Sequence, residues 1–329
     1  MRLRLALQVA VLLLTPNVAT AAPPAQCDPR NTRPETCKDI WNGIGLPASN
    51  ATSGKIAICH DRYIVSHDNA SKTPDWVLEL LTGRKLTNKY DRPKSENFSP
   101  DLCVPKESTA TAGDYSGTKD KLAKGHMAPS EDFNNSIVNM RDTFVFSNAI
   151  PQAGSSFNGA IWRSLENEVR KAAKARKKLY VITGPIRGDG VTRKISIAKA
   201  DNACGGAIEL ETFKTRSICK ALNSGQAAEC SNGVAVPVGV YKIAYDPDRK
   251  AAFGFVMANR NHKTGLGRQY MQESRVNIGV IEKLTGLKFF DALPEAERAA
   301  LVNRCEQTTL WLPPKPKAKP NAKKKRKPA

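Results

Sequence analysis

The stretch AKGHMAP, residues 123–129, decides the prediction of fold and function for this chain. Its histidine, His126, directly follows Gly125 and lies two residues after Lys124. Glycine allows the backbone to turn sharply or to approach another group closely. A histidine beside a flexible residue and near a cation suits a site that faces phosphate. On these seven residues alone, a surface-loop histidine remains an alternative.

The forty residues that follow add polar groups to this histidine. Residues 143–147, TFVFS, are β-branched and aromatic and predict a strand, at whose end Asn148 lies. Residues 159–178 carry an apolar stripe at i+4 spacing and predict a helix, with Asn158 just before it as a candidate cap. Glu166 lies eight residues beyond Asn158, about 80° around an α-helix and roughly 12 Å along it. An amide oxygen suits Mg²⁺ that keeps most of its waters. Asn158 and Glu166 therefore indicate either a metal site or a helix cap and a solvated charge.

The flanking sequence predicts a mixed α and β domain. We expect hairpins at 56–66 and 240–257, further strands at 76–81 and 179–183, and a second helix at 274–285 that ends at Gly286. Strands that alternate irregularly with helices favour an α+β fold over a doubly wound sheet. No internal repeat and no second domain boundary is visible between about residues 40 and 310.

The two ends of the chain predict segments outside the fold. Residues 1–21 have two arginines, an apolar run and a small-residue cleavage pattern, which are typical of a secretory signal peptide. No later stretch predicts a membrane span. Residues 313–329 hold eight Lys and Arg and no acid, so we expect a disordered basic tail that either binds phosphate backbones or only aids solubility. The domain is thus expected at 22–312, in a secreted or periplasmic protein.

Eight cysteines follow the predicted cleavage site, and an even number in an exported chain predicts structural disulfides. They allow 105 connectivities, so the sequence assigns no pairs. The local candidates are Cys27–Cys37 and a bridge within Cys204–Cys230. The cysteines and histidines show no zinc-site spacing.

The charge balance points to a polyanionic partner. Lys and Arg number 51 against 31 Asp and Glu, a net charge of +20. Without the eight tail charges and the two signal-peptide arginines, 20 − 8 − 2 leaves +10. A charge this far from zero favours nucleic acid or an acidic surface. The composition is that of a globular protein and excludes a wholly disordered chain, a collagen and a polytopic membrane protein.

The order of the motifs resembles the DNA/RNA non-specific endonucleases of the ββα-metal class, a family that includes mitochondrial endonuclease G. The family pattern has Asp-Arg-Gly-His, then a strand with Ser-Asn and Pro-Gln, then Asn, Trp and Leu-Glu on one helix. The matching positions, within a similarity that runs over roughly 55–300, are Ala123–Pro129, Thr143–Asn148, Pro151-Gln152, Phe157-Asn158, Trp162 and Leu165-Glu166. The resemblance implies a central, mainly antiparallel sheet flanked by helices, which we expect disulfides to stabilise.

The resemblance also implies roles for particular residues. His126 would be the general base that takes a proton from the attacking water, and Asn148 would fix the geometry near it. Asn158 would be the single direct protein ligand of a hydrated Mg²⁺, with Mn²⁺ as an alternative ion, and Glu166 would hold water around that ion. Lys124 would act near the base and bind phosphate, and Arg92 and Arg170 would bind substrate. DNA and RNA would both be cleaved to 5′-phosphate products, and a homodimer is left open because family members often dimerise.

Two positions depart from the family pattern. Ala123 replaces the motif's Asp, and Lys124 replaces its Arg. Lysine keeps the charge but lacks the planar fork with which arginine binds phosphate. Asp120 is a candidate to support the lysine. The alternative prediction is therefore a catalytically weakened protein that binds nucleic acid on the same fold.

Overall fold

The computed structural model describes residues 33–49, 54–87, 89–93, 97–115, 122–188, 194–211, 217–220, 227–231, 233–263 and 267–306. The predicted signal peptide, the basic tail and Asp120 lie outside these residues. Within the described part, no helix is both long and apolar enough to cross a membrane.

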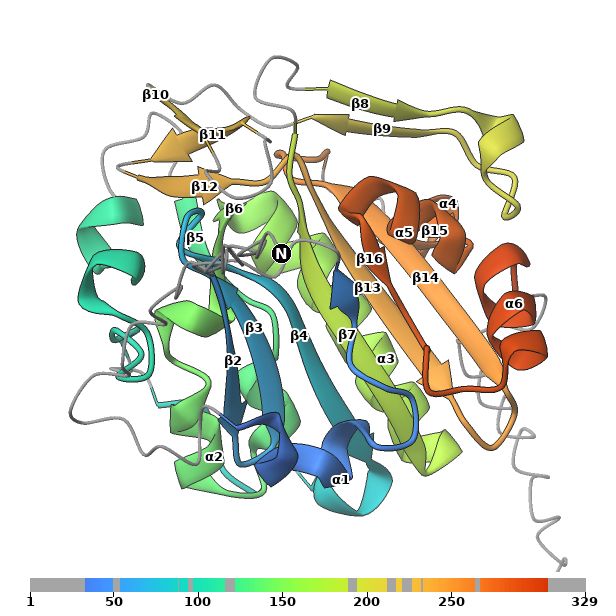
Figure 1. Ribbon diagram of the computed structural model, residues 1–329, viewed down its shortest axis with the longest axis horizontal. Helices are drawn as coiled ribbons and strands as arrows, with labels where there is room; N and C mark the ends of the chain where they lie inside the picture. Colours follow the sequence, from blue (N-terminus) through green and yellow to red (C-terminus); the bar gives the residue numbers. More distant parts are fainter. Residues whose placement is uncertain are drawn as a thin grey trace, which may run out of the picture.

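A seven-stranded sheet forms the centre of the molecule, and every neighbouring pair in it is antiparallel (Figure 1). Its strand order is β15-β14-β13-β7-β4-β3-β2. In that order the strands are Arg275–Val276, Ala251–Ala258, Gly239–Asp246, Lys178–Ile186, Thr73–Thr82, Tyr63–Asp68 and Lys55–His60. The α+β fold and all the strands predicted between 56 and 81 and between 179 and 257 are confirmed.

Smaller pairings surround this sheet. They are β1 (Ala48–Ser49) with β16 (Leu287–Lys288), β5 (Leu122–His126) with β6 (Ala149–Ala153), β8 (Lys194–Ile197) with β9 (Ile208–Glu211), and β10 (Ser217–Lys220) with β11 (Ala227–Ser231) and β12 (Val234–Val236). In Figure 1 the β5–β6 strand pair lies at the upper left beside β12. In this strand pair, β5 carries His126 of the AKGHMAP stretch.

Helices cover both faces of the central sheet because its strands alternate apolar side chains between the two faces. One face carries Val65, Val77 and Val181 and packs against Trp162 and Leu165. The other face packs against the terminal helices (Figure 1). The helices are α1 (Lys38–Trp41), α2 (Ile137–Asp142), the π-helix η8 (Gly154–Trp162), α3 (Arg163–Arg176), α4 (Gly267–Glu273), α5 (Ile278–Thr285) and α6 (Glu295–Asn303).

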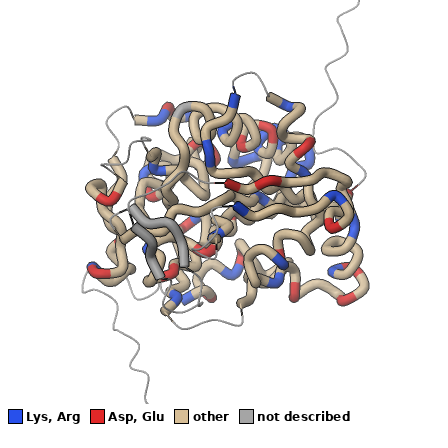
Figure 2. Tube along the Cα trace, turned by 90° about the horizontal axis from the view of Figure 1, so that it is seen from above, with Lys and Arg blue, Asp and Glu red and all other residues tan. Residues whose placement is uncertain are grey.

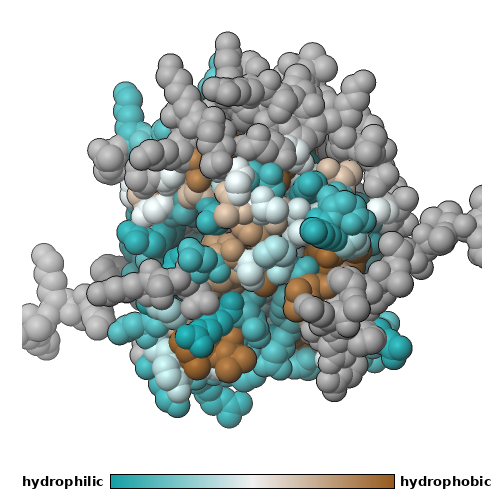
Figure 3. All heavy atoms as spheres, turned by 90° about the vertical axis from the view of Figure 1, so that its left-hand side faces the viewer, coloured by the Kyte–Doolittle hydropathy of each residue, from teal (hydrophilic) through white to brown (hydrophobic). Residues whose placement is uncertain are grey.

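The surface of the described part is mostly hydrophilic. Figure 2 shows Lys and Arg interspersed with Asp and Glu along the chain trace. The side of the molecule at the left of Figure 1 shows hydrophilic side chains with smaller apolar patches among them (Figure 3). Among the described residues, the exposed large hydrophobic side chains are Tyr90, Leu102 and Val138.

The structure corrects three predicted elements. Residues 143–147 do not form a strand. Val145 makes only an isolated bridge with Ser99, and a 3₁₀ turn, η7 (Phe146–Asn148), follows it. The helix predicted at 159–178 begins earlier, because η8 opens at Gly154 and continues into α3. The helix predicted at 274–285 is shorter than expected, since residues 275–276 belong to β15, but it ends at Gly286 in the left-handed conformation as predicted.

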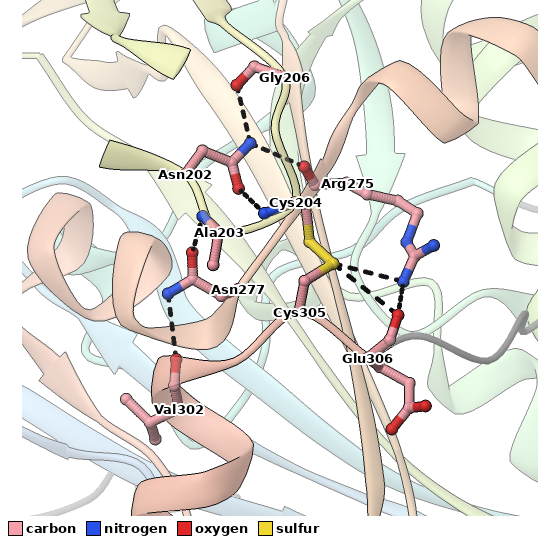
Figure 4. The surroundings of a disulfide bond; sticks show 9 residues. All are labelled: Asn202, Ala203, Cys204, Gly206, Arg275, Asn277, Val302, Cys305 and Glu306. Atoms are coloured by element: carbon pink, nitrogen blue, oxygen red, sulfur yellow. Dashed lines mark hydrogen bonds between the residues drawn. A yellow bond between two sulfur atoms is a disulfide. The ribbon is translucent and has the colours of Figure 1, made fainter. Parts of the chain in front are cut away.

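The local disulfide candidates are also wrong for two cysteines. Cys37 pairs with Cys59, rather than with Cys27, and Cys204 pairs with Cys305 across 101 residues (Figure 4). Sequence proximity failed because a strand and a helix distant in the chain bring the partners together. Cys59 lies on β2 and Cys305 lies just after α6.

Candidate active site

His126 lies at the end of β5, on a strand rather than in a loop. β5 pairs antiparallel with β6, and His126 is opposite Ala149. The preceding glycine is required by packing, because a Cβ at Gly125 would collide with the side chain of Gln152. Lys124 stands two residues before His126, so both side chains leave the same face of the strand. Lys124 itself is half-buried.

The imidazole of His126 lies in an aromatic enclosure. The ring centroids of Phe98 and Phe144 lie 4.6 Å and 4.8 Å from that of His126. The side chain is buried, and its Nε2 has no hydrogen-bond partner among the described residues. Burial, and to a smaller extent the charge of Arg92, lower the pKa of His126 to about 3. His126 is therefore a neutral imidazole at neutral pH, with a nitrogen available to accept a proton.

Asn148 fixes the backbone immediately after His126. Its side-chain Oδ1 accepts a hydrogen bond from the Ala128 N–H at 2.9 Å, and its Nδ2 donates to the Ala128 carbonyl at 3.0 Å. Nδ2 also donates to the Thr143 carbonyl at 3.0 Å, and the Asn148 carbonyl accepts from the Met127 N–H at 2.9 Å. Asn148 is fully buried. These bonds tie η7 to Met127 and Ala128, the two residues that directly follow His126.

The π-helix η8 carries Asn158. Asn158 is half-buried within η8, so it is not a residue that precedes and caps the helix, as the sequence had suggested. A π-helical turn has i→i+5 hydrogen bonds and often occurs at functional sites. Both β5 and β6 contact η8. The helix turn that holds Asn158 therefore packs against the strand pair that holds His126.

Glu166 is buried on α3 and is not a solvated helix charge. Burial raises its pKa to about 8, while the charges of Lys242 and Arg170 oppose that rise. Lys242 comes from β13, where it is 1% exposed and its Nζ donates to Thr183 Oγ1 at 2.6 Å. A carboxyl group with its pKa near neutrality, beside buried cations, can accept a cation when it ionises.

Arg170, one turn beyond Glu166, is also held from within the protein. Its Nε donates to Asp132 Oδ1 at 2.5 Å and its Nη1 donates to Asn167 Oδ1 at 2.7 Å. Desolvation lowers the pKa of Arg170, but the charges of Asp132 and Glu166 outweigh it and raise the pKa. Arg92 is exposed, and its guanidinium lies 4.8 Å from the centroid of Phe144, the ring that also contacts His126. Arg92 and Arg170 line one cavity of about 500 Å³.

The donor set fits a hydrated divalent cation. The described residues contain no cluster of three or more His, Cys, Asp and Glu that could chelate a metal directly. One amide, Asn158, and one buried carboxyl, Glu166, are available instead. Mg²⁺ usually keeps several waters and takes only one or two protein oxygens. Asn158 and Glu166 supply donors of these types.

The structure brings the predicted residues into two adjoining groups. Around the Phe144 ring lie His126 and Arg92, with Asn148 fixing the backbone beside them. On η8 and α3 lie Asn158, Glu166 and Arg170. One residue of each group, Arg92 and Arg170, lines the same cavity.

Three supporting features escaped the sequence reasoning. The aromatic pair Phe98 and Phe144, the Asp132 carboxylate and Lys242 come from four separate places in the chain. Phe98 follows the candidate Arg92 closely and Phe144 lies in the stretch matched to the family, but neither position predicted a ring against His126. Asp132 and Lys242 had no signal in the sequence, because their role depends on long-range packing.

Comparison with known proteins agrees with this geometry. A family model described as DNA/RNA non-specific endonuclease matches residues 45–296, so the chain belongs to that family. The chain is 30% identical over 271 residues to the mitochondrial nuclease EXOG of Danio rerio, a match that covers 80% of this chain and 68% of that protein. It is 29% identical to nuclease C1 of Cunninghamella echinulata var. echinulata, covering 76% of this chain and 87% of that one.

A solved structure supports the fold independently. The structure described as an EndoG/EndoGI complex has a chain similar to this one, with a TM-score of 0.61 and 23% identity over 83% of this chain and 97% of that chain. The ββα-metal nuclease fold is thus confirmed. The match to EXOG proteins spans about two thirds of their length.

Proposed function

We propose that this protein is a secreted or periplasmic Mg²⁺-dependent endonuclease that hydrolyses phosphodiester bonds of DNA and RNA. The observation that carries the proposal is the buried Nε2 of His126, which has no partner among the described residues and lies on a strand end fixed by Asn148. A neutral imidazole in this position can act as a general base. The membership of the family and the nuclease relatives support the same reaction class.

Asn158 and Glu166 would hold the Mg²⁺ ion, for which Mn²⁺ is a substitute. A bound divalent cation supplies positive charge that neutralises the phosphate and stabilises the departing oxygen. Asn158 would be the direct ligand, and Glu166 would orient water around the ion. Arg170, held by Asp132, adds a fixed positive charge one turn away on α3.

His126 would take a proton from a water molecule while the oxygen of that water attacks phosphorus. The bond from phosphorus to the 3′-oxygen then breaks, and the phosphate stays on the 5′ end of the downstream fragment. Arg92 would bind a non-bridging oxygen of the phosphate, and Lys124, on the same strand face as His126, would add a second cation. Proton transfer by such a base contributes typically about 10²–10⁴-fold to a rate.

The test is cleavage of supercoiled plasmid and of a folded RNA by the purified protein, with disulfides formed, in Mg²⁺ and in EDTA. We expect Mg²⁺-dependent fragments of both polymers that carry 5′-phosphates. Manganese should restore cleavage after chelation. Cleavage that continues unchanged in EDTA would overturn the metal dependence. Cleavage of DNA alone or of RNA alone would contradict the proposal that the protein cleaves both.

A second function has one observation in its favour. Lys124 replaces the arginine of the family motif, and lysine binds phosphate as a point charge without a bidentate fork. A protein weakened in this way would bind nucleic acid with a strong salt dependence and cleave it slowly. Lys124→Arg would then raise the cleavage rate well above that of the natural chain, whereas an unchanged rate would remove this alternative.

A further inference from the structure

A cavity lies between the Arg92 loop and α3, and His126 is not among its lining residues. Its volume of about 500 Å³ falls within the range of pockets that hold small ligands, about 300–1,000 Å³. Its charged lining residues are Asp91, Arg92, Glu131, Arg170, Lys171 and Lys174. Cations outnumber acids by four to two along this wall, so the cavity favours an anion.

The cations differ in how firmly they are held. Arg170 is buried and paired with Asp132, and it belongs to the active site already described. Lys171 and Lys174 are exposed on the next turn of α3. Lys171 pairs with Glu168 at 2.8 Å, with 59% of the Lys171 side chain and 11% of the Glu168 side chain exposed. The exposed ammonium can turn toward an incoming phosphate. The lysines therefore extend the positive surface beyond the reacting phosphate.

One aromatic side chain lines the same cavity. Tyr90 is 36% exposed, and no other Phe, Tyr or Trp among the described residues is classed as exposed. Its backbone N–H donates to the Asn134 carbonyl at 2.9 Å, which fixes the loop, and Lys89 Nζ lies 5.1 Å from the ring centroid. An exposed ring on an anchored backbone in a basic cavity is a platform on which a nucleic-acid base can stack.

We propose that this cavity binds the nucleotide next to the scissile phosphate, with its base stacked on Tyr90 and its phosphate bound by Lys171 and Lys174. This subsite rests on the proposed function, because it continues from the Arg92 and Arg170 pair. Stacking tolerates any base since every base has a π-face. The base must leave its neighbours to reach the ring, so the cavity selects unpaired or locally melted strands over intact duplex.

The first test measures binding of a labelled single-stranded 12-mer to the His126→Ala protein in EDTA, by fluorescence anisotropy. Tyr90→Ala should weaken binding by roughly 5- to 150-fold, the range that one base–aromatic stacking contact produces. Tyr90→Phe keeps the ring and should bind nearly as the parent does. The loss should be smaller for a blunt duplex of the same sequence. Equal affinity of the Tyr90→Ala and parent proteins for the single strand would overturn the subsite.

The second test uses salt dependence to locate the phosphate contact. The logarithm of the binding constant falls with the logarithm of the salt concentration. Removing two phosphate contacts to a single strand should make this negative slope less steep by about 1.4. We expect this change in Lys171→Gln/Lys174→Gln. The matched control is Lys283→Gln/Lys288→Gln, two exposed lysines on α5 and β16, across the sheet from α3. Equal slope changes in both pairs would overturn the contact and indicate only general electrostatic attraction.

The two tests separate the subsite from the nuclease reaction. Plasmid cleavage by the unaltered protein with no effect of Tyr90→Ala on binding would retain the nuclease and reject the subsite. Weakened binding in Tyr90→Ala with no cleavage by the unaltered protein would reject the nuclease and retain a nucleotide-binding cavity.

Discussion

At the scale of single residues, the site depends on removing His126 from water while leaving its Nε2 without a partner. Phe98 and Phe144 enclose the ring, and Asn148 fixes the chain after it. Burial disfavours the imidazolium, so the ring stays a neutral base. The same burial makes the histidine a source of acid sensitivity.

We expect stability to fall as pH falls from about 6.5 toward 4. His126 keeps a neutral ring down to a pKa of about 3 in the folded protein, whereas an unfolded histidine binds a proton near 6.5. The unfolded state thus binds more protons in this window, which costs up to about 1.4 kcal/mol per pH unit for this group. Urea unfolding at pH 7 and pH 4.5 should show a smaller decrease for His126→Gln than for the natural protein. An identical decrease would contradict the buried neutral histidine.

Glu166 makes the stability of the fold depend on pH in the opposite direction. Its pKa of about 8 in the fold exceeds the ordinary value near 4.5, so the folded state binds more protons and stability is lost as pH rises between these values. In EDTA at pH 8, Glu166→Gln should therefore raise the melting temperature while it lowers Mg²⁺-dependent cleavage. Thermal scans with and without Mg²⁺ measure both effects. A lower melting temperature for the variant in EDTA would show that the carboxyl is not destabilising.

Much of the site could be predicted at this scale, but not its surroundings. The order of the motifs and their resemblance to the family pointed to His126, Asn148 and Glu166, whereas their residue types alone left other roles open. Nothing pointed to Asp132 and Lys242, because a lone acid in a turn or a lysine in a strand usually faces water. Their burial against α3 arises only when β13 and the 130–133 turn are folded together.

At the scale of elements, the π-helix sets the direction of Asn158 relative to Glu166. The apolar stripe of 159–178 predicted α3 correctly, but a pattern of i+4 spacing carries no signal for an i→i+5 turn. The strand expected at 143–147 failed for a related reason. Phe144 and Phe146 both pack against Phe98, and Phe144 also contacts the His126 ring. The chain turns into η7 at Phe146 instead of continuing as a strand.

Deleting Gly159 tests whether cleavage depends on the orientation of Asn158 relative to Glu166. Removing one residue between Asn158 and Glu166 rotates one against the other by about 100°. We expect roughly a 10²-fold or larger loss of Mg²⁺-dependent cleavage, since small misplacements in an active site have such effects. Gly159→Ala is the control, because an added Cβ meets only the Gly154 carbonyl oxygen, at 4.0 Å. A folded deletion variant with full activity would show that the π-helical turn has no role.

At the scale of the whole molecule, hairpins were predictable and their assembly was not. Strands β2–β3 and β13–β14 are close in sequence, so short-range turn signals sufficed. β13 pairs with β7 across 53 to 65 positions of the chain, and β7 pairs with β4 across 96 to 106. Turn signals act over a few residues, so they do not predict these pairings. The same distance explains why the Cys204–Cys305 bridge was missed.

That bridge should contribute strongly to stability. It joins the 202–206 loop to the end of α6, where Arg275 Nη2 donates to the Glu306 carbonyl (Figure 4). A cross-link over about 100 residues restricts the unfolded chain by about 4.7 kcal/mol in the entropy account. Cys204→Ser/Cys305→Ser should lower the free energy of unfolding by several kcal/mol, as measured by denaturant titration. Cleavage at 25 °C should persist where the variant stays folded. An unchanged unfolding midpoint would contradict this role.

The most direct test of the central claim is the single-turnover rate of plasmid cleavage by His126→Ala in Mg²⁺. A matched control is His67→Gln, a buried histidine on β3 whose Nε2 lies 3.0 Å from the Ser108 carbonyl oxygen, a contact that the glutamine amide can replace. With both variants folded by circular dichroism, we predict a loss of about 10²–10⁴-fold for His126→Ala and a rate near that of the natural protein for His67→Gln. A His126→Ala rate equal to that of the natural protein would contradict the account.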